Sequence, residues 1–384
     1  MKKFLALLLA GLLLLSLAAC GDKEKDNNDE NDNENTSQVD MNYIEETSNK
    51  GKFEYALNDE GDYEIVKYEP YSVALSDITL PNEVNGRDIV GIAANAFKAE
   101  STLKSVVIPS TYTYIEEYAF YDCDALTGIT LPASIETIGK GAFESCDVLA
   151  SFTMSAAIKE IPEYAFKDCK ALTALDLSSV EKIQKGAFLN CASLTTVTVF
   201  DKLTYATKEA FYGCDKLTYT EEGELLYLGN EANKTLLLVS PKSINIDNCA
   251  VSATTKVVAD AAFNNCEMLT SITLSDAVKS INGTSFVGCT ELNYNKSENG
   301  LYLGTTANPY MVLIEVDIKS VEDFKLNKDT RIIADTAFIS CPVIEDISFE
   351  GTAEQWTAII KSADWNGDLT INVICSDKTV TVLG

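Results

Sequence analysis

The sequence predicts a repeat solenoid of the α/β type, built mostly from short strands, and two observations carry this prediction. The first is a motif of alanine, phenylalanine, two variable residues and cysteine, whose cysteines stand at positions 123, 146, 169 and 191, every 22 or 23 residues. The second is a leucine three residues after each of these cysteines. Each leucine opens a short run in which apolar and polar residues alternate, as in Leu126 to Leu131.

Each repeat can be read as one turn of a coil. In the strand from Leu126 to Leu131, the leucines and Ile129 point inward, whereas Gly128 and Thr130 face outward. Isoleucines then return to the core along the far side, and an Ala-Phe pair forms a short helical turn whose ring fills the coil. A period in the twenties with leucines at fixed positions is typical of a leucine-rich repeat, in which stacked coils share one core.

The chain begins with an export signal. Two lysines at positions 2 and 3 precede a mainly apolar stretch over residues 4–17, so we expect residues 1–19 to be a signal peptide. The segment ends in Leu-Ala-Ala-Cys20, which resembles the lipobox of bacterial lipoproteins. This resemblance implies that Cys20 is lipidated and becomes the mature N-terminus. The alternatives are a plain secretory signal or a short membrane anchor.

The segment after the signal is acidic and nearly free of apolar residues. Residues 20–40 comprise the predicted lipidated end and a tether in which acidic residues and asparagine predominate, so we expect this segment to be disordered. No later stretch approaches the ~18–20 uninterrupted apolar residues of a spanning helix. We therefore expect an exported protein that is held at the outer face of a bacterial membrane, at the cell surface, by its lipid alone.

The chain is strongly acidic, with 58 acidic against 30 basic residues and a formal net charge of −28. This charge argues against nucleic acid as a partner and against adsorption to anionic lipid. It names no partner by itself, because the solubility of an exported protein is a sufficient explanation.

The cysteines are predicted to be buried free thiols rather than disulfides. The chain has 11, and eight of them occupy the repeat position: 123, 146, 169, 191, 214, 266, 289 and 341. Neighbouring coils would stack these thiols in one inward-facing column, where parallel side chains suit a disulfide poorly. Disulfides remain the alternative for an exported protein. The chain has no histidine and its repeat cysteines recur singly, so we expect no metal site.

The solenoid is predicted to cover residues 75–350, with a cap at each end. Residues 41–74 contain two alternating runs, 52–57 and 63–68, that predict a hairpin covering the open end of the first coil. Residues 351–384 predict a small α+β cap. There Thr352 and Gln355 fit a capping box, and a helix carries Trp356, Ile359 and Ile360 on its apolar face.

Two insertions interrupt the period. The intervals from Cys214 to Cys266 and from Cys289 to Cys341 are both 52 residues long. Each contains the same pattern, Leu-Tyr-Leu-Gly followed by Ala-Asn and a second apolar run, at an offset of 75 residues. We expect β-hairpin insertions at about 219–248 and 294–323 that arose as one duplicated unit. They are either structural decoration or a binding feature, since insertions into repeats usually emerge on one face.

The repeated pattern resembles the BspA-like leucine-rich repeats of bacterial surface proteins. The resemblance rests on Leu-x-x-Ile-x-Leu-Pro, the isoleucines that follow it and Ala-Phe-x-x-Cys, and it covers roughly residues 75–350. It implies a right-handed superhelix of ~23-residue coils on an exported protein. For function it implies only that some relatives are thought to attach to host or microbial surfaces.

We expect no enzymatic activity and no cofactor. Without histidine the chain cannot form a Ser-His or Cys-His pair. Adjacent acids such as Glu116-Glu117 and Glu221-Glu222 could in principle serve a glycosidase, but chance pairs are expected among 58 acidic residues. The sequence contains neither a phosphate-binding loop nor a dinucleotide fingerprint.

The favoured function is a surface module, monomeric, for binding or adhesion to an unknown extracellular protein or glycan. The competing hypothesis is a structural spacer of the cell envelope without a dedicated ligand. The outward-facing strand residues form one surface of small side chains, with tyrosines as exceptions beside the insertions. The candidate ligand contacts are Tyr219, Tyr227, Tyr294, Tyr302, Thr130, Thr153, Asp176 and Thr198. Alternatively, the four tyrosines only seat the hairpins.

Overall fold

The computed structural model describes most of the chain beyond residue 41. The described residues are 42–44, 51–70, 76–199, 201–316, 323–335, 337–362, 365–366 and 369–383. They belong to one compact unit, Asp40–Gly384. The predictions of a signal peptide over residues 1–19, of lipidation at Cys20 and of an acidic tether up to residue 40 fall outside the described residues.

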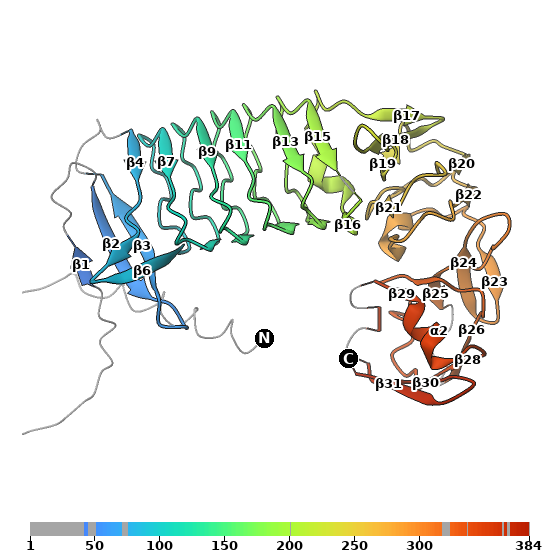
Figure 1. Ribbon diagram of the computed structural model, residues 1–384. Helices are drawn as coiled ribbons and strands as arrows, with labels where there is room; N and C mark the ends of the chain where they lie inside the picture. The colour runs from blue at the N-terminus through green and yellow to red at the C-terminus, as the bar shows by residue number, and fades with distance from the viewer. Residues whose placement is uncertain are drawn as a thin grey trace, which may run out of the picture. The chain divides into compact units, whose positions relative to one another are not determined.

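The described chain is a β-solenoid with two short parallel strands in each regular coil. The first strand of each regular coil belongs to what we call the front sheet, whose members before the first insertion stand side by side along one edge of the coils in Figure 1. Its members are β4 (Asp77–Thr79), β7 (Ser105–Val107), β9 (Gly128–Thr130), β11 (Ser151–Thr153), β13 (Ala174–Leu177), β15 (Thr196–Val199), β20 (Asn248–Ala250), β22 (Ser271–Thr273), β26 (Asp323–Leu326) and β28 (Asp346–Phe349).

The second strand of every coil belongs to the rear sheet, on the other side of the core. Its members are β6 (Arg87–Ile92), β8 (Tyr114–Ile115), β10 (Thr137–Ile138), β12 (Glu160–Ile161), β14 (Lys182–Ile183), β16 (Tyr205–Ala206), β21 (Val257–Val258), β27 (Ile332–Ile333) and β29 (Ile360–Lys361). A short strand β5 (Glu83–Val84) pairs antiparallel with β6. The expected alternation is confirmed, because β9 buries Ile129 between two outward-facing neighbours.

The Ala-Phe segments are tight turns, and the prediction of helical turns holds in only two coils. The two exceptions are 3₁₀ turns over Lys208–Phe211 and Gly283–Phe286. In five other coils a left-handed residue stands directly before the alanine and another directly before the cysteine, as Tyr118 (φ 56°) and Asp122 (φ 61°) do in one of them. Left-handed residues on both sides prevent the turn from continuing as a right-handed helix.

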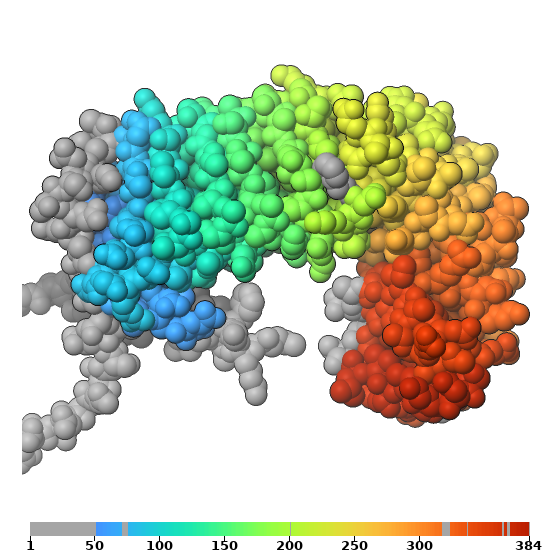
Figure 2. All heavy atoms as spheres, in the orientation of Figure 1, coloured from blue at the N-terminus to red at the C-terminus, as the bar shows by residue number. Residues whose placement is uncertain are grey.

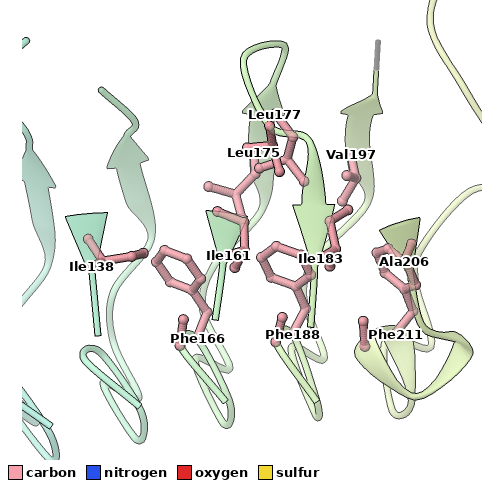
Figure 3. Packing of buried hydrophobic residues seen from close by; sticks show 14 of the residues in the cluster. Ile138, Ile161, Phe166, Leu175, Leu177, Ile183, Phe188, Val197, Ala206 and Phe211 are labelled. Atoms are coloured by element: carbon pink, nitrogen blue, oxygen red, sulfur yellow. The ribbon is translucent and has the colours of Figure 1, made fainter. Parts of the chain in front are cut away.

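A column of stacked phenylalanine rings forms the centre of the solenoid. The rings of Phe97, Phe120, Phe143, Phe166, Phe188 and Phe211 follow one another with centroids 4.9–5.8 Å apart. Figure 3 shows Phe166, Phe188 and Phe211 in line, each from the turn of its own coil. Figure 2 shows that side chains fill the space between the ribbons of successive coils. Each ring is therefore buried by the coils on either side.

The repeat cysteines form a second column beside the rings. All ten cysteines in the described part of the chain are free thiols. Six of them donate a hydrogen bond of 3.1 Å from Sγ to the carbonyl oxygen of the phenylalanine one coil earlier: Cys123, Cys146, Cys169, Cys191, Cys214 and Cys289. Burial raises the pKa of the Cys169 thiol, so the group stays protonated and able to donate.

The predicted N-terminal hairpin is present as β2 (Lys52–Leu57) and β3 (Tyr63–Glu69), and β1 (Asn42–Ile44) pairs with β2. Strand β3 pairs parallel with β6 and so extends the rear sheet. The ring of Tyr68 stacks on Phe97 at 5.2 Å. The hairpin thus covers the end of the phenylalanine column.

The C-terminal end is closed by α2 (Ala353–Ala358), β30 (Ile371–Ile374) and β31 (Thr379–Val382). The predicted capping box is confirmed, because Thr352 and Gln355 exchange both of its hydrogen bonds. Trp356 and Ile359 are buried, but Ile360 is 41% exposed. Its assignment to the apolar face of the helix was wrong, because α2 ends at Ala358 and Ile360 begins β29.

Each insertion is a three-stranded antiparallel unit that is built into the solenoid. The first comprises β17 (Thr220–Glu222), β18 (Leu225–Leu228) and β19 (Leu237–Pro241), and the second β23 (Asn295–Ser297), β24 (Gly300–Leu303) and β25 (Val312–Val316). The predicted hairpins are β18–β19 and β24–β25. Strands β19 and β25 also pair parallel with β21 and β27, so both insertions extend the rear sheet.

The two insertions share their turns as well as their strands. A Cβ added to Gly229 would lie 2.1 Å from the carbonyl oxygen of Asn233, and one added to Gly304 would lie 2.0 Å from that of Asn308. Both asparagines donate from Nδ2 to a backbone carbonyl in the next coil, at 3.0 and 2.8 Å. These contacts explain why glycine and asparagine recur at an offset of 75 residues.

A buried tyrosine attaches each insertion to the coil that follows. The hydroxyl of Tyr227 accepts a hydrogen bond of 3.2 Å from the backbone N–H of Ser252. The hydroxyl of Tyr302 accepts one of 3.3 Å from the N–H of Asn327. Both tyrosines are 0% exposed. Each hydroxyl therefore satisfies a backbone donor of the neighbouring coil.

Removal of one ring from the column should cost about 3–5 kcal/mol of unfolding free energy, because a buried phenylalanine leaves a cavity when it becomes alanine. The test is urea denaturation of Phe166→Ala. The control is Thr153→Ala, because Thr153 is exposed on strand β11 of the front sheet. A loss for Phe166→Ala no larger than that for the control would show that the column does not carry stability.

The tyrosine attachment predicts a smaller loss. Tyr227→Phe keeps the ring but leaves the Ser252 N–H without its acceptor, and we expect about 1–3 kcal/mol of destabilisation. The matched control is Tyr212→Phe, since the side chain of Tyr212 is 45% exposed. Equal stabilities of the two variants in thermal denaturation would contradict the role assigned to the Tyr227 hydroxyl.

Candidate functional site

The candidate site is the outer face of the front sheet. Parallel pairing in register places Ser105, Gly128 and Ser151 in one column. The second column holds Val107 beside Thr130, which lies beside Thr153. The columns continue in the next strand pair, with Ala174 beside Thr196 and Asp176 beside Thr198. The predicted contacts Thr130, Thr153, Asp176 and Thr198 therefore lie on one face.

This face is nearly flat, because its side chains are short. Thr130, Thr153 and Asp176 are exposed, and Thr198 is partly exposed. A Cβ added to Gly128 would lie 2.6 Å from Oγ of Ser151, so even alanine would crowd its neighbour. The face can offer hydroxyl groups and short apolar surface to a partner, but few deep contacts.

Hydrogen bonds between coils hold the edge of this face, a feature that the sequence analysis missed. Thr127 donates from Oγ1 to the carbonyl oxygen of Lys104 at 3.3 Å, and Thr195 donates to that of Thr173 at 3.0 Å. Both threonines directly follow the opening leucine of a coil. Their recurrence at one position of the motif was the available signal. The contacts fix the spacing of the strands that carry the face.

One carboxylate at the first coil is held by two hydroxyls. Asp77 accepts hydrogen bonds from Ser105 Oγ at 2.5 Å and from Ser76 Oγ at 2.8 Å. These bonds, that of Ser105 foremost, lower the pKa of Asp77 below its ordinary value. The start of the face is therefore anionic at neutral pH. A further carboxylate, Asp176, accepts a bond from the Ser178 N–H at 3.0 Å in the turn after its strand.

The tyrosines predicted as ligand contacts are not part of this face. Tyr227 and Tyr302 are 0% exposed, which contradicts their assignment as contacts. Tyr219 and Tyr294 are partly buried and pack against the core, and desolvation raises the pKa of both. The structure instead agrees with the alternative that the tyrosines seat the insertions. The reason is that strands β18 and β24 point their tyrosines inward.

The acidic pairs considered for catalysis, Glu116-Glu117 and Glu221-Glu222, lie in different coils, and one member of each pair makes a local contact. Glu116 accepts a hydrogen bond from the Ala94 N–H at 3.2 Å, and Glu221 forms an ion pair of 2.7 Å with Lys242. Within the described ranges, no group of three or more Asp, Glu or Cys side chains is placed to hold a metal ion. The same part of the chain holds no helix of the length and apolarity needed to cross a membrane.

Several solved structures with similarity to this chain are named as leucine-rich proteins. A leucine-rich cell surface protein from Faecalibacterium prausnitzii is 22% identical over 83% of this chain and 97% of its own, with a TM-score of 0.42. A leucine-rich-repeat protein of T. pallidum is 23% identical over 63% and 88%, with a TM-score of 0.35. The pneumococcal vaccine antigen PcpA is 15% identical over 88% and 99%, also with a TM-score of 0.35.

A search of curated proteins found no match. The family model for the BspA-type leucine-rich-repeat region, in contrast, matches residues 90–218 and 241–359 in six copies. These ranges include every strand of the front sheet after β4 and cover well over half of the chain. The chain therefore belongs to the family of BspA-type leucine-rich-repeat proteins.

Proposed function

We propose that this chain is a lipid-anchored binding protein of the bacterial cell surface, without enzymatic activity, and that its front sheet contacts a protein or glycan. The observation that carries the proposal is the exposed ladder of small side chains at Ser105–Val107, Gly128–Thr130 and Ser151–Thr153. A regular solenoid needs only the inward-facing residues for stability, so the outward-facing ones are available for recognition.

The flatness of the face favours a partner that is itself flat or repetitive. Tight protein interfaces rely on a few large anchors, chiefly tryptophan, tyrosine and arginine, and the columns from Ser105 to Thr198 contain none of them. Affinity would instead come from many small contacts over several coils. An extended glycan or an extended peptide can make such contacts, because its own repeat can follow the strand spacing.

Anchorage follows from the N-terminal motif. Leu-Ala-Ala-Cys20 after an apolar stretch supports lipidation of Cys20. The acidic residues that follow would repel one another and keep the segment extended. Membership of a family with relatives on bacterial surfaces agrees with this placement.

The anchor predicts a clear change in cell fractionation. Cys20→Ser should abolish labelling by a radioactive fatty acid and release the protein from the membrane fraction, whereas Ser16→Ala, in the same apolar segment, should do neither. Fatty-acid labelling and membrane retention of Cys20→Ser at the level of the unaltered chain would refute the proposed lipid anchor.

If the front sheet is the binding site, a bulky substitution on it should weaken the binding of a ligand. The purified chain is screened against extracellular-matrix proteins and a glycan array, and every ligand found is titrated against Thr130→Arg. We expect its affinity to fall about tenfold or more, because one bulky side chain on the flat face separates the surfaces. The control is Thr137→Arg, at an exposed threonine of the same repeat that lies in the rear sheet.

Equal affinities of the two arginine variants would exclude the front sheet as the site. If no ligand is found in the screen, the chain acts as a spacer of the envelope, and the proposed binding function is wrong.

A further inference from the structure

The rear sheet contains a pocket that the proposed function does not use. Its volume is about 680 Å³, and it is lined by residues that lie as far apart in the sequence as Lys182 and Ser362. Strands β14, β16 and β29 contribute to its walls, as does Lys256, directly before β21. Its size falls within the ~300–1,000 Å³ that is usual for small-molecule sites.

The pocket is cationic although the chain is strongly acidic. Four lysines line it, namely Lys182, Lys256, Lys279 and Lys361, against the two carboxylates Asp201 and Asp335. The net charge of the chain is −28, so an excess of lysine is unexpected from composition. The local charge therefore favours an anion.

Three of the four lysines are available to a ligand. Lys256 forms an ion pair of 2.9 Å with Asp201. In the part of the chain that the structure describes, no ion pair involves Lys182, Lys279 or Lys361. Lys182 and Lys279 are exposed at the walls of the pocket.

Lys361 is held in place by neutral groups. Its Nζ donates to the carbonyl oxygens of Trp356 and Ile359, both at 2.7 Å, and lies 4.3 Å from the centre of the Trp356 ring. Burial lowers the pKa of Lys361 to about 8. An ammonium has three N–H donors, so this oriented cation has one left for a further acceptor. A bound anion would offset the hydration that Lys361 loses through burial, because a nearby negative charge favours the charged ammonium.

The rest of the lining suits a ligand rich in hydroxyl groups. Ser280 and Ser362 supply hydroxyl groups that can both donate and accept. Thr204 already donates to the Glu181 carbonyl and can accept, and Gln184, whose amide donates to Glu160, keeps its oxygen and a second N–H. Tyr205 adds an aromatic ring that is partly exposed. The neutral groups can bind the hydroxyls of a sugar acid or a sugar sulfate, and the lysines beside them can bind its charged group.

Strand β14, which carries Lys182, offers no edge to which a peptide could add a strand. Strand β14 is paired on both edges, by β12 and β16. The rear sheet continues from there through a bridge between Thr207 and Asp260 and another between Val257 and Ser280. At Lys182 an acidic peptide would therefore have to bind through side chains alone.

We propose that this pocket is a second binding site, specific for an anionic saccharide that carries carboxylate or sulfate groups. The ammonium groups of Lys182, Lys279 and Lys361 bind the charge, and the neutral lining binds the hydroxyls. The site lies on the rear sheet, so it goes beyond the contact face proposed above and stands or falls independently of it.

The test is calorimetric titration of the full chain with defined probes. Trigalacturonate supplies carboxylates only, its methyl ester is the uncharged match, and a chondroitin sulfate tetrasaccharide adds sulfate. We expect binding of at least one charged saccharide and none of the methyl ester. Binding of trigalacturonate would identify carboxylate as sufficient, and binding of only the sulfated probe would identify sulfate. Failure of both charged probes, or equal binding of the ester, overturns the proposal.

Variants assign the binding to the pocket. The double variant Lys182→Gln with Lys279→Gln should weaken the affinity about tenfold or more, since two charge-assisted contacts are lost. The control is Lys216→Gln with Lys234→Gln, two exposed lysines outside the pocket that change the net charge equally. Because all four lysines are exposed, we expect both double variants to fold, and thermal denaturation checks this.

Equal affinities of the pocket and control variants would show that binding occurs elsewhere and would refute the site. Hexaglutamate serves as the competing probe. If it binds more tightly than either saccharide and the pocket variant abolishes this, the pocket recognises acidic peptide and the saccharide proposal is wrong. The Thr130→Arg variant should bind the charged saccharide normally, which separates this result from that of the front sheet.

Discussion

The structure depends on the fact that no coil of this solenoid can bury its own centre. Each phenylalanine ring lies between the rings of its neighbours, so the core exists only as a stack. The thiol column follows the same rule, because Cys146 and Cys169 each donate to a carbonyl oxygen of the preceding coil. The caps are equally required, since Tyr68 supplies the neighbour that Phe97 would otherwise lack. Stability is thus a property of contacts between coils.

The insertions allow this stack to be interrupted without a loss of core. The buried side chains fall into two clusters, and the strands of the second insertion contribute to both. Leu303 and Val312 belong to the larger cluster, whereas Tyr302 and Leu313 belong to the C-terminal one. Adjacent residues of one strand point to opposite faces, so β24 and β25 separate two cores as a shared layer. An inserted layer of this kind must be apolar on both faces.

The features of this structure differ in how far the sequence alone predicts them. The coils, the thiol column and the helix cap at Thr352 follow from local patterns, since period and spacing determine them. The burial of Tyr227 and Tyr302 does not, because it comes from the following coil, whose Ser252 and Asn327 meet the hydroxyls from 25 residues further along the chain. The cationic pocket is also invisible in the sequence. Lys182 and Lys361 are far apart along the chain, and neither belongs to the repeated motif.

The glycine–asparagine turn between the two hairpin strands of each insertion has an evolutionary consequence. Gly229 and Asn233 recur as Gly304 and Asn308, and both asparagines bind the coil that follows in the same way. A 75-residue segment therefore begins and ends on compatible surfaces. Recombination between such copies can lengthen or shorten the protein by whole units while every junction keeps its existing contacts. The length of the solenoid can then evolve separately from the residues exposed on the front sheet.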